Sequence, residues 1–221
     1  IGPNASPTEG KRVVPKFILI LTFSLNSTTM MGSAARATKR RFLLVASPRV
    51  KVSIRRTAMD SYLAVVRFLH IGAGITWIGI LYYFNFIQAP AFARMEASAR
   101  SNAVMVLVPR ALLWFRHAAW VTVALGLLYV LSAGLDQGWD IYAKTSSFKS
   151  ILVGGTLGVI MLGNVWLIIW PNQKKIIAGE LEGDALAKAK RSAFLASRTN
   201  AWLSIPMLIG MIAANHGGIM F

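Results

Sequence analysis

Four long runs of apolar residues, at 61–88, 111–133, 148–170 and 199–220, dominate the second part of the chain. A helix needs about 20 residues, at about 1.5 Å each, to cross the hydrocarbon core of a bilayer. The runs lack the alternation of period two expected of barrel strands, so helices are predicted. We expect the first run to end before Pro90, the third to stop at Pro171 and the fourth to kink at Pro206. The pattern therefore predicts an all-α integral membrane four-helix bundle within residues 59–221.

The segments between the later runs are more polar. Residues 135–147 form a short polar loop between the second and third runs. Residues 179–197, rich in Ala, Lys, Glu and Leu, predict a further helix that lies along the membrane or projects from it. Charged residues make up only 14% of the chain, whereas a soluble domain carries about 25%. This low charge agrees with a surface that largely faces lipid.

The net charge of +16 is concentrated near the start of the chain. Residues 1–58 hold 11 of the 24 basic residues and one of the 8 acids, which leaves 13 and 7 for residues 59–221. We interpret 1–58 as a basic N-terminal extension. It is either a targeting segment, with 17–25 as a signal-like core or an Arg-rich transit sequence, or non-native translation upstream of Met59, which we favour. A basic groove with interleaved aromatics is not evident, so no nucleic-acid partner is expected.

The distribution of charge between the apolar runs predicts their orientation, because cytoplasmic loops collect Lys and Arg. The first loop carries Arg94, Arg100 and Arg110, and the third carries six basic residues between Lys174 and Arg198. The second loop has two lysines offset by two aspartates. We therefore expect a multi-pass protein of the bacterial inner membrane, with both ends of residues 59–221 on the periplasmic side.

All three histidines fall in apolar runs, where ionisable side chains are costly and usually functional. His70 lies in the first run, His117 in the second and His216 near the end of the fourth. Helix rise places His70 and His216 within roughly 8 Å of the same depth. Two histidines on different helices are a pattern typical of axial haem ligation, so both are candidate ligands of a haem iron, with His117 as a further cofactor-binding candidate. The alternative is that they are structural or interfacial histidines.

Cofactor type follows from the residues that are missing. The chain has no cysteine, which excludes covalent haem attachment through C-x-x-C-H and leaves b-type haem. Copper or another metal on the same histidines is less favoured, because carboxylate and thiolate ligands are lacking.

Other polar and small residues in the runs suggest binding sites. Arg116, with Asn164 and Asn200 as polar companions, is a candidate for binding an anionic substrate, and the alternative is that Arg116 anchors a helix by snorkelling to the interface. Gly154 and Gly158 have the G-x-x-x-G spacing that lets helices approach closely. That contact would join two copies or another subunit, or it would pack helices within one bundle, which we favour.

Several segments resemble a known family. They are FLHIGAGITWIGILYYFNFIQAPAF at 68–92, PRALLWFRHAAW at 109–120, GNVWLIIWPNQKKII at 163–177 and SRTNAWLSIPML at 197–208. Together they resemble the membrane domain of the bacterial membrane-bound, cytochrome-c-linked urate oxidase family, over about residues 60–218. The W-P-x-Q-K-K and S-R-T-N-x-x-x-S-I-P segments are the most specific. The resemblance implies a urate oxidase- or hydroxylase-type oxidoreductase whose electrons pass to a cytochrome c.

Three functions remain open from the sequence. The first is a haem b-binding membrane redox protein, which needs a separate cytochrome as acceptor because this chain has no cysteine. The second is a non-enzymatic subunit or scaffold of a larger membrane complex. The third is a carrier for a purine anion that uses Arg116, disfavoured because the chain shows no internal repeat.

Overall fold

Long helices make up almost all of the computed structural model, which describes residues 48–218. Of these residues 91% are helical and none is in a strand, so the predicted all-α class is confirmed. The elements are α2 (Pro48–Tyr82), η1 (Tyr83–Gln88), α3 (Ala89–Arg94), α4 (Ala97–Gln137), α5 (Trp139–Tyr142), α6 (Ser146–Gly163), η2 (Asn164–Ile169), α7 (Trp170–Ile177) and α8 (Gly183–Ala213). The predictions about residues 1–47 lie outside the described residues, and the proposed boundary at Met59 stays a prediction.

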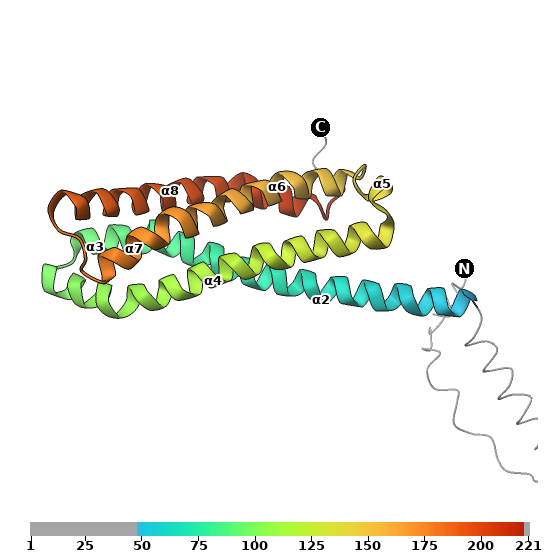
Figure 1. The fold of residues 1–221 in the computed structure, drawn as a ribbon, viewed down its shortest axis with the longest axis horizontal. Coiled ribbons are helices and arrows are strands. Elements are labelled where there is room, and N and C mark those ends of the chain that lie inside the picture. Colours follow the sequence, from blue (N-terminus) through green and yellow to red (C-terminus); the bar gives the residue numbers. More distant parts are fainter. Residues whose placement is uncertain (1–47, 219–221) are drawn as a thin grey trace, which may run out of the picture. The chain divides into compact units, whose positions relative to one another are not determined.

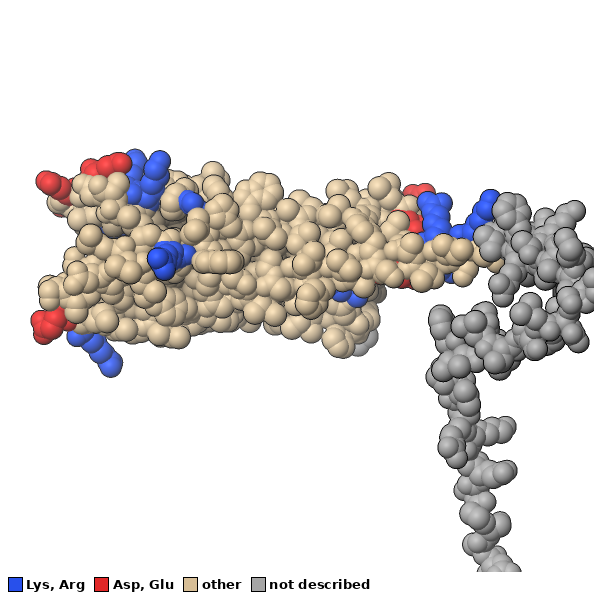
Figure 2. Space-filling view, turned by 90° about the horizontal axis from the view of Figure 1, so that it is seen from below, with Lys and Arg blue, Asp and Glu red and all other residues tan. Residues whose placement is uncertain are grey.

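Three helical stretches are long and apolar enough to cross a membrane: Val50–Arg94, Ala97–Gln137 and Ser146–Ile177. In their most apolar windows only 17%, 28% and 22% of residues are buried inside the molecule. Apolar side chains that the protein itself does not cover need another apolar environment. On the face drawn in Figure 2, charged residues gather toward the ends of the helices, and the surface between them is almost free of charge. The first three predicted spans are therefore membrane-span-capable helices.

The fourth predicted span, 199–220, does not form as expected. The helix α8 is continuous from Gly183, so the separate helix predicted at 179–197 is part of it, and it ends at Ala213. A turn follows, in which Gly217 and Gly218 have φ of 91° and 90°. The charge-free part of α8 after Arg198 thus has 15 residues, from 199 to 213, or about 22 Å. This is short of the roughly 30 Å of a hydrocarbon core.

Prolines do not end the helices where the sequence pattern predicted. Pro90 and Pro171 each lie two residues after a π-helical segment, η1 and η2, and the helix then continues to Arg94 and to Ile177. Proline lacks an N–H for the carbonyl four residues earlier, and its ring crowds that carbonyl. A π-helical turn shifts the bonds to i→i+5. We infer that the wider turn accommodates each proline while the helix axis continues.

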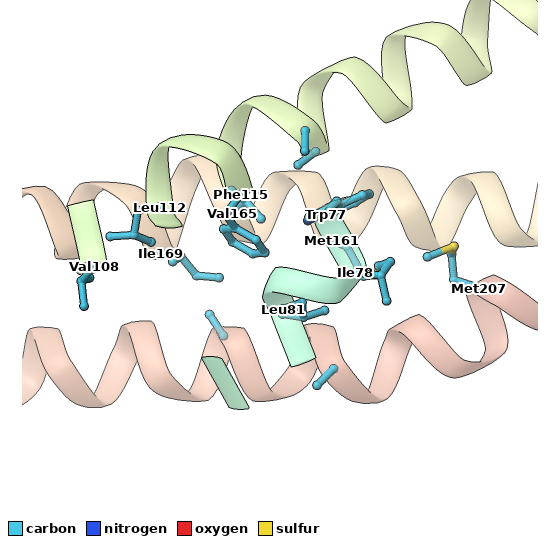
Figure 3. Close-up of a cluster of buried hydrophobic side chains, with 14 residues drawn as sticks. Trp77, Ile78, Leu81, Val108, Leu112, Phe115, Met161, Val165, Ile169 and Met207 are labelled. Carbon is cyan, nitrogen blue, oxygen red and sulfur yellow. The ribbon is translucent and has the colours of Figure 1, made fainter. Parts of the chain in front are cut away.

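Within residues 55–218 the four long helical segments alternate in direction along the chain (Figure 1). Hydrogen bonds define the register: Tyr82 meets Ser204, and Asn85 meets Ser197, so α2–η1 and α8 run antiparallel. The main core lies among the four helical segments. It combines Trp77 and Leu81 of α2 with Phe115 of α4 and Val165 of η2, all at most 1% exposed (Figure 3).

The closest helix approach joins α6 and α8. A Cβ built on Gly154 would lie 2.9 Å from the Met207 carbonyl oxygen, and one on Gly210 would lie 3.0 Å from the Gly154 nitrogen. These are backbone atoms, which cannot move aside without moving a helix. Gly154 therefore packs inside the chain, the alternative favoured from the sequence. Gly158 is buried, but nothing lies within 4 Å of its built Cβ.

The two glycines provide a matched test of this seam. Gly154→Ala should lower the free energy of unfolding by about 1–3 kcal/mol, because the methyl group forces two helix backbones apart. Gly158→Ala should leave stability unchanged or raise it by up to about 1 kcal/mol through helix propensity. Unfolding of the detergent-purified variants in sodium dodecyl sulfate measures both. Equal stability of the two variants would contradict the proposed seam.

Candidate functional site

His70 is held in a notch between α2 and α4. Its Nδ1 lies 2.7 Å from the carbonyl oxygen of Thr122. A carbonyl only accepts, so Nδ1 is the donor in this bond, and Nε2 has no hydrogen-bond partner among the described residues. Gly126 makes the room, because a Cβ there would lie 3.0 Å from the His70 Cε1. Metal-ligating histidines are commonly fixed by such a bond from the second ring nitrogen to a backbone carbonyl.

The next turns of α2 and α4 extend this notch. The Arg67 guanidinium donates a hydrogen bond to the Tyr129 hydroxyl and lies 4.9 Å from the centre of its ring. Tyr62 and Ser132 meet one level further along, with 3.3 Å between their oxygens. Arg67 was missed in the sequence analysis, although it lies inside the first apolar run at helical spacing from His70. Arg67 and His70 thus form a polar side of α2 that faces α4.

His216 lies in the turn after α8 and is exposed. Its Nδ1 is 2.9 Å from the carbonyl oxygen of Ile212, and its Nε2, like that of His70, has no hydrogen-bond partner among the described residues. The hydrogen bonds from Tyr82 to Ser204 and from Asn85 to Ser197 fix the register of α2–η1 against α8 near η1. His216 lies beyond the end of α8 at Ala213, so the similar depth of His70 and His216 stays a prediction. No contact joins the two histidines in the described part of the chain.

His117 has different surroundings. It is exposed, its ring meets the edge of Trp166 with 6.4 Å between centroids, and neither ring nitrogen has a hydrogen bond to a described residue. Across residues 48–218 no group of three His, Asp or Glu side chains is arranged to hold a metal ion. The ligation of haem iron by one or two of these histidines stays a prediction.

Asn164 and Asn200 are brought together, as the sequence analysis grouped them. The Asn164 amide donates to the Asn200 side-chain oxygen at 2.8 Å, and the Asn200 amide donates to the Met161 carbonyl at 2.9 Å. Asn200 is fully buried. Asn85 makes a parallel link from η1, donating to the Ser197 hydroxyl at 2.8 Å. Both π-helical segments are thus tied to α8 by an asparagine, which gives these residues a structural role.

Arg116 lies apart from the asparagine pair, in a pocket between α4 and α7. The cavity has a volume of about 500 Å³. Three cationic side chains line it: Arg110, Arg116 and Lys174. The walls between them are Pro109, Leu113, Trp170, Ile177 and Ala178. We call this the basic pocket.

Arg116 is positioned firmly within the basic pocket. Its guanidinium carbon lies 3.7 Å from the centre of the Trp170 ring, a close cation–π stack. Its Nε is buried and has no hydrogen-bond partner among the described residues. A snorkelling anchor would extend its head group into water, so the stacked position differs from that alternative. The stacked Arg116 guanidinium thus has a buried N–H that lacks an acceptor among the described residues.

The comparisons bear on the part of the chain that contains most of these features. Residues 112–221 match the family model described as Urate oxidase N-terminal. The resemblance inferred from the sequence is thereby confirmed over this part, which includes Arg116, His117, Asn164, Asn200 and His216. His70 and Arg110 lie outside the matched range. Comparisons with curated proteins and with solved structures found no match.

The asparagine pair can be separated from a ligand-binding role by its stability contribution. Asn200→Ala should lower the free energy of unfolding by about 0.6–2 kcal/mol, because the Met161 carbonyl and the Asn164 amide lose partners in an apolar interior. Asn172 donates only to Ile168 on its own helix surface, so Asn172→Ala is the matched control with little effect. Equal unfolding curves for both variants in detergent would rule out the structural role.

Proposed function

We propose that this protein is a membrane redox protein that binds b-type haem through His70 and His216 and passes electrons to a separate cytochrome. One observation carries the proposal: each imidazole has its Nδ1 on a backbone carbonyl, and neither Nε2 has a hydrogen-bond partner among the described residues. When bound, haem supplies one-electron oxidation and reduction at its iron. The family match to a urate oxidase domain supports urate as the substrate.

The chain's own residues would prepare such a site in distinct ways. The Thr122 carbonyl fixes the ring orientation of His70, and Gly126 leaves the space that the ring occupies. The Ile212 carbonyl orients His216 in the same manner. Arg67 adds a positive charge one turn from His70, which would favour the reduced, less positive state of a nearby group. The chain has no cysteine, so covalently bound haem would belong to the partner cytochrome.

The membrane arrangement is part of the proposal. We infer a multi-pass protein of the bacterial inner membrane in which α2, α4, α6–α7 and the apolar end of α8 form a four-helix bundle. The three span-capable helices support insertion, and the basic residues of the first and third loops support their cytoplasmic placement. The short charge-free part of α8 would then rest against the other helices and not cross the core alone.

A second candidate function is a non-enzymatic membrane subunit or scaffold. The observation that favours it is that His70 lines neither the basic pocket nor the smaller pocket beside Tyr82, Asn85 and Trp202. In that case His70 serves to join α2 to α4, and the exposed side of α6 that contains Gly155 and Val159 contacts another protein. Normal function of His70 variants within an assembled complex would favour this alternative.

The haem proposal is tested by reduced-minus-oxidised absorption spectra of detergent-purified protein expressed with ample haem. The wild type should show a Soret band and the bands of b-type haem, and His70→Ala and His216→Ala should each lose most of this absorbance. His117→Ala is the matched control, because His117 makes no carbonyl bond, and it should keep the spectrum. Circular dichroism checks that each variant is folded.

A folded wild-type protein without haem absorbance would contradict the proposal. So would bands that persist when both His70 and His216 are replaced. Loss of the spectrum in His117→Ala alone would move the ligand set away from α2 and α8.

A further inference from the structure

The basic pocket is unusual because its three positive charges have no negative partner. Arg110, Arg116 and Lys174 form no ion pair with any residue in the described part of the chain. Their mutual repulsion matters most at Arg116, whose Nε is buried, because charges interact more strongly where water is excluded. An arrangement of like charges around one cavity is therefore most stable when an anion occupies it.

The location of the pocket fits a ligand that is charged at one end and apolar elsewhere. The predicted apolar run of α4 begins at residue 111, directly after Arg110. The predicted apolar run of α6 and η2 ends at Trp170, four residues before Lys174. The pocket thus lies where two membrane-span-capable helices leave their apolar stretches. Leu113 and Ile177 line the pocket and are 46% and 38% exposed, so they add apolar surface at its edge.

The donors in the pocket differ in burial, which suggests how they share an anion. Arg116 is half-buried and stacked on Trp170, and it offers a planar set of N–H donors. Arg110 and Lys174 are exposed. Arginine recognises phosphate oxygens by paired hydrogen bonds, and lysine acts as a point charge beside them. One stacked and two exposed cations can surround a phosphate whose remaining part extends outward.

We propose that the basic pocket binds the phosphate head group of an anionic phospholipid, with Arg116 as the fixed contact and the acyl chains along Leu113 toward the apolar run of α4. Basic pockets between transmembrane helices bind lipid head groups in this way. The positive-inside rule places this end of α4 and α7 at the cytoplasmic leaflet. The lipid would fill the space between α4 and α7 and stabilise their packing. This site is independent of haem and of the redox proposal.

The proposal is tested with the full chain in detergent by native mass spectrometry and by spin-labelled lipids in vesicles. The wild type should retain phosphatidylglycerol and should associate with it several-fold more strongly than with phosphatidylcholine. Arg116→Gln should reduce this preference toward one. The double variant Arg110→Gln/Lys174→Gln changes only exposed side chains, so it should fold normally and lose most of the preference as well.

The matched control is Lys144→Gln/Lys149→Gln, which removes two exposed positive charges, one between α5 and α6 and one in the first turn of α6. It should keep the preference for phosphatidylglycerol. Equal loss in this control would show a general charge effect and overturn the site. No preference in the wild type, or full preference in both pocket variants, would also overturn it.

Competition separates the lipid from soluble anions with similar chemistry. Inorganic phosphate and urate, each added at millimolar concentration, should not displace bound phosphatidylglycerol, because they lack the apolar part that lies along Leu113. Displacement by either anion would overturn the lipid assignment and identify the pocket as a site for a soluble anion. These readouts need no haem, so they stay interpretable if the redox proposal fails.

Discussion

Polar atoms inside apolar helices must find partners within the chain, and this constraint organises the structure. Lipid offers no hydrogen bonds, so each unpaired group is expensive. Asn200 therefore holds the Met161 carbonyl, Asn85 holds Ser197, and His70 uses a carbonyl of α4. These bonds link helices that would otherwise contact each other only through apolar side chains. They fix the register that apolar packing alone leaves loosely determined.

The few polar atoms that escape this rule mark the places where another molecule is expected. Five side-chain atoms are buried without partners among the described residues: Arg116 Nε, the indole nitrogens of Trp77 and Trp166, Gln88 Oε1 and the Tyr142 hydroxyl. Three of these five atoms, in Arg116, Tyr142 and Trp166, belong to the part of the chain that matches the urate oxidase domain family. These atoms are the places where the described part of the chain could accept a hydrogen bond from another molecule or donate one to it.

Much of the fold could be predicted from the sequence, because the length of an apolar run translates directly into a helix. The first three spans were located correctly in their centres, and the use of Gly154 inside the chain was the favoured interpretation. Helix ends were predicted less well. Pro90 and Pro171 suggested stops, but π-helical turns let the helices continue. The fourth run was read as a span to 220, whereas the turn with Gly217 and Gly218 follows Ala213.

The candidate sites were only partly predictable. Residue type alone singled out His70, Arg116 and the asparagines, because polar groups in apolar runs are rare. Their partners could not be deduced: the carbonyl of Thr122, the space at Gly126 and the stack of Arg116 on Trp170 depend on the register between helices. Backbone carbonyls in particular carry no sequence signal. Arg67 was missed although its spacing from His70 was visible, since its partner Tyr129 lies 62 positions away.

The central claim, that apolar faces exposed on the molecule are covered by lipid, is tested most directly by cysteine accessibility. The chain has no native cysteine, so single cysteines report cleanly. Leu127 and Val159 are 54% and 49% exposed on the molecule, within two span-capable helices. In intact membranes, cysteines there should resist a membrane-impermeant maleimide from either side, whereas one at Glu182 should react from one side. Rapid labelling at 127 and 159 without detergent would contradict the account.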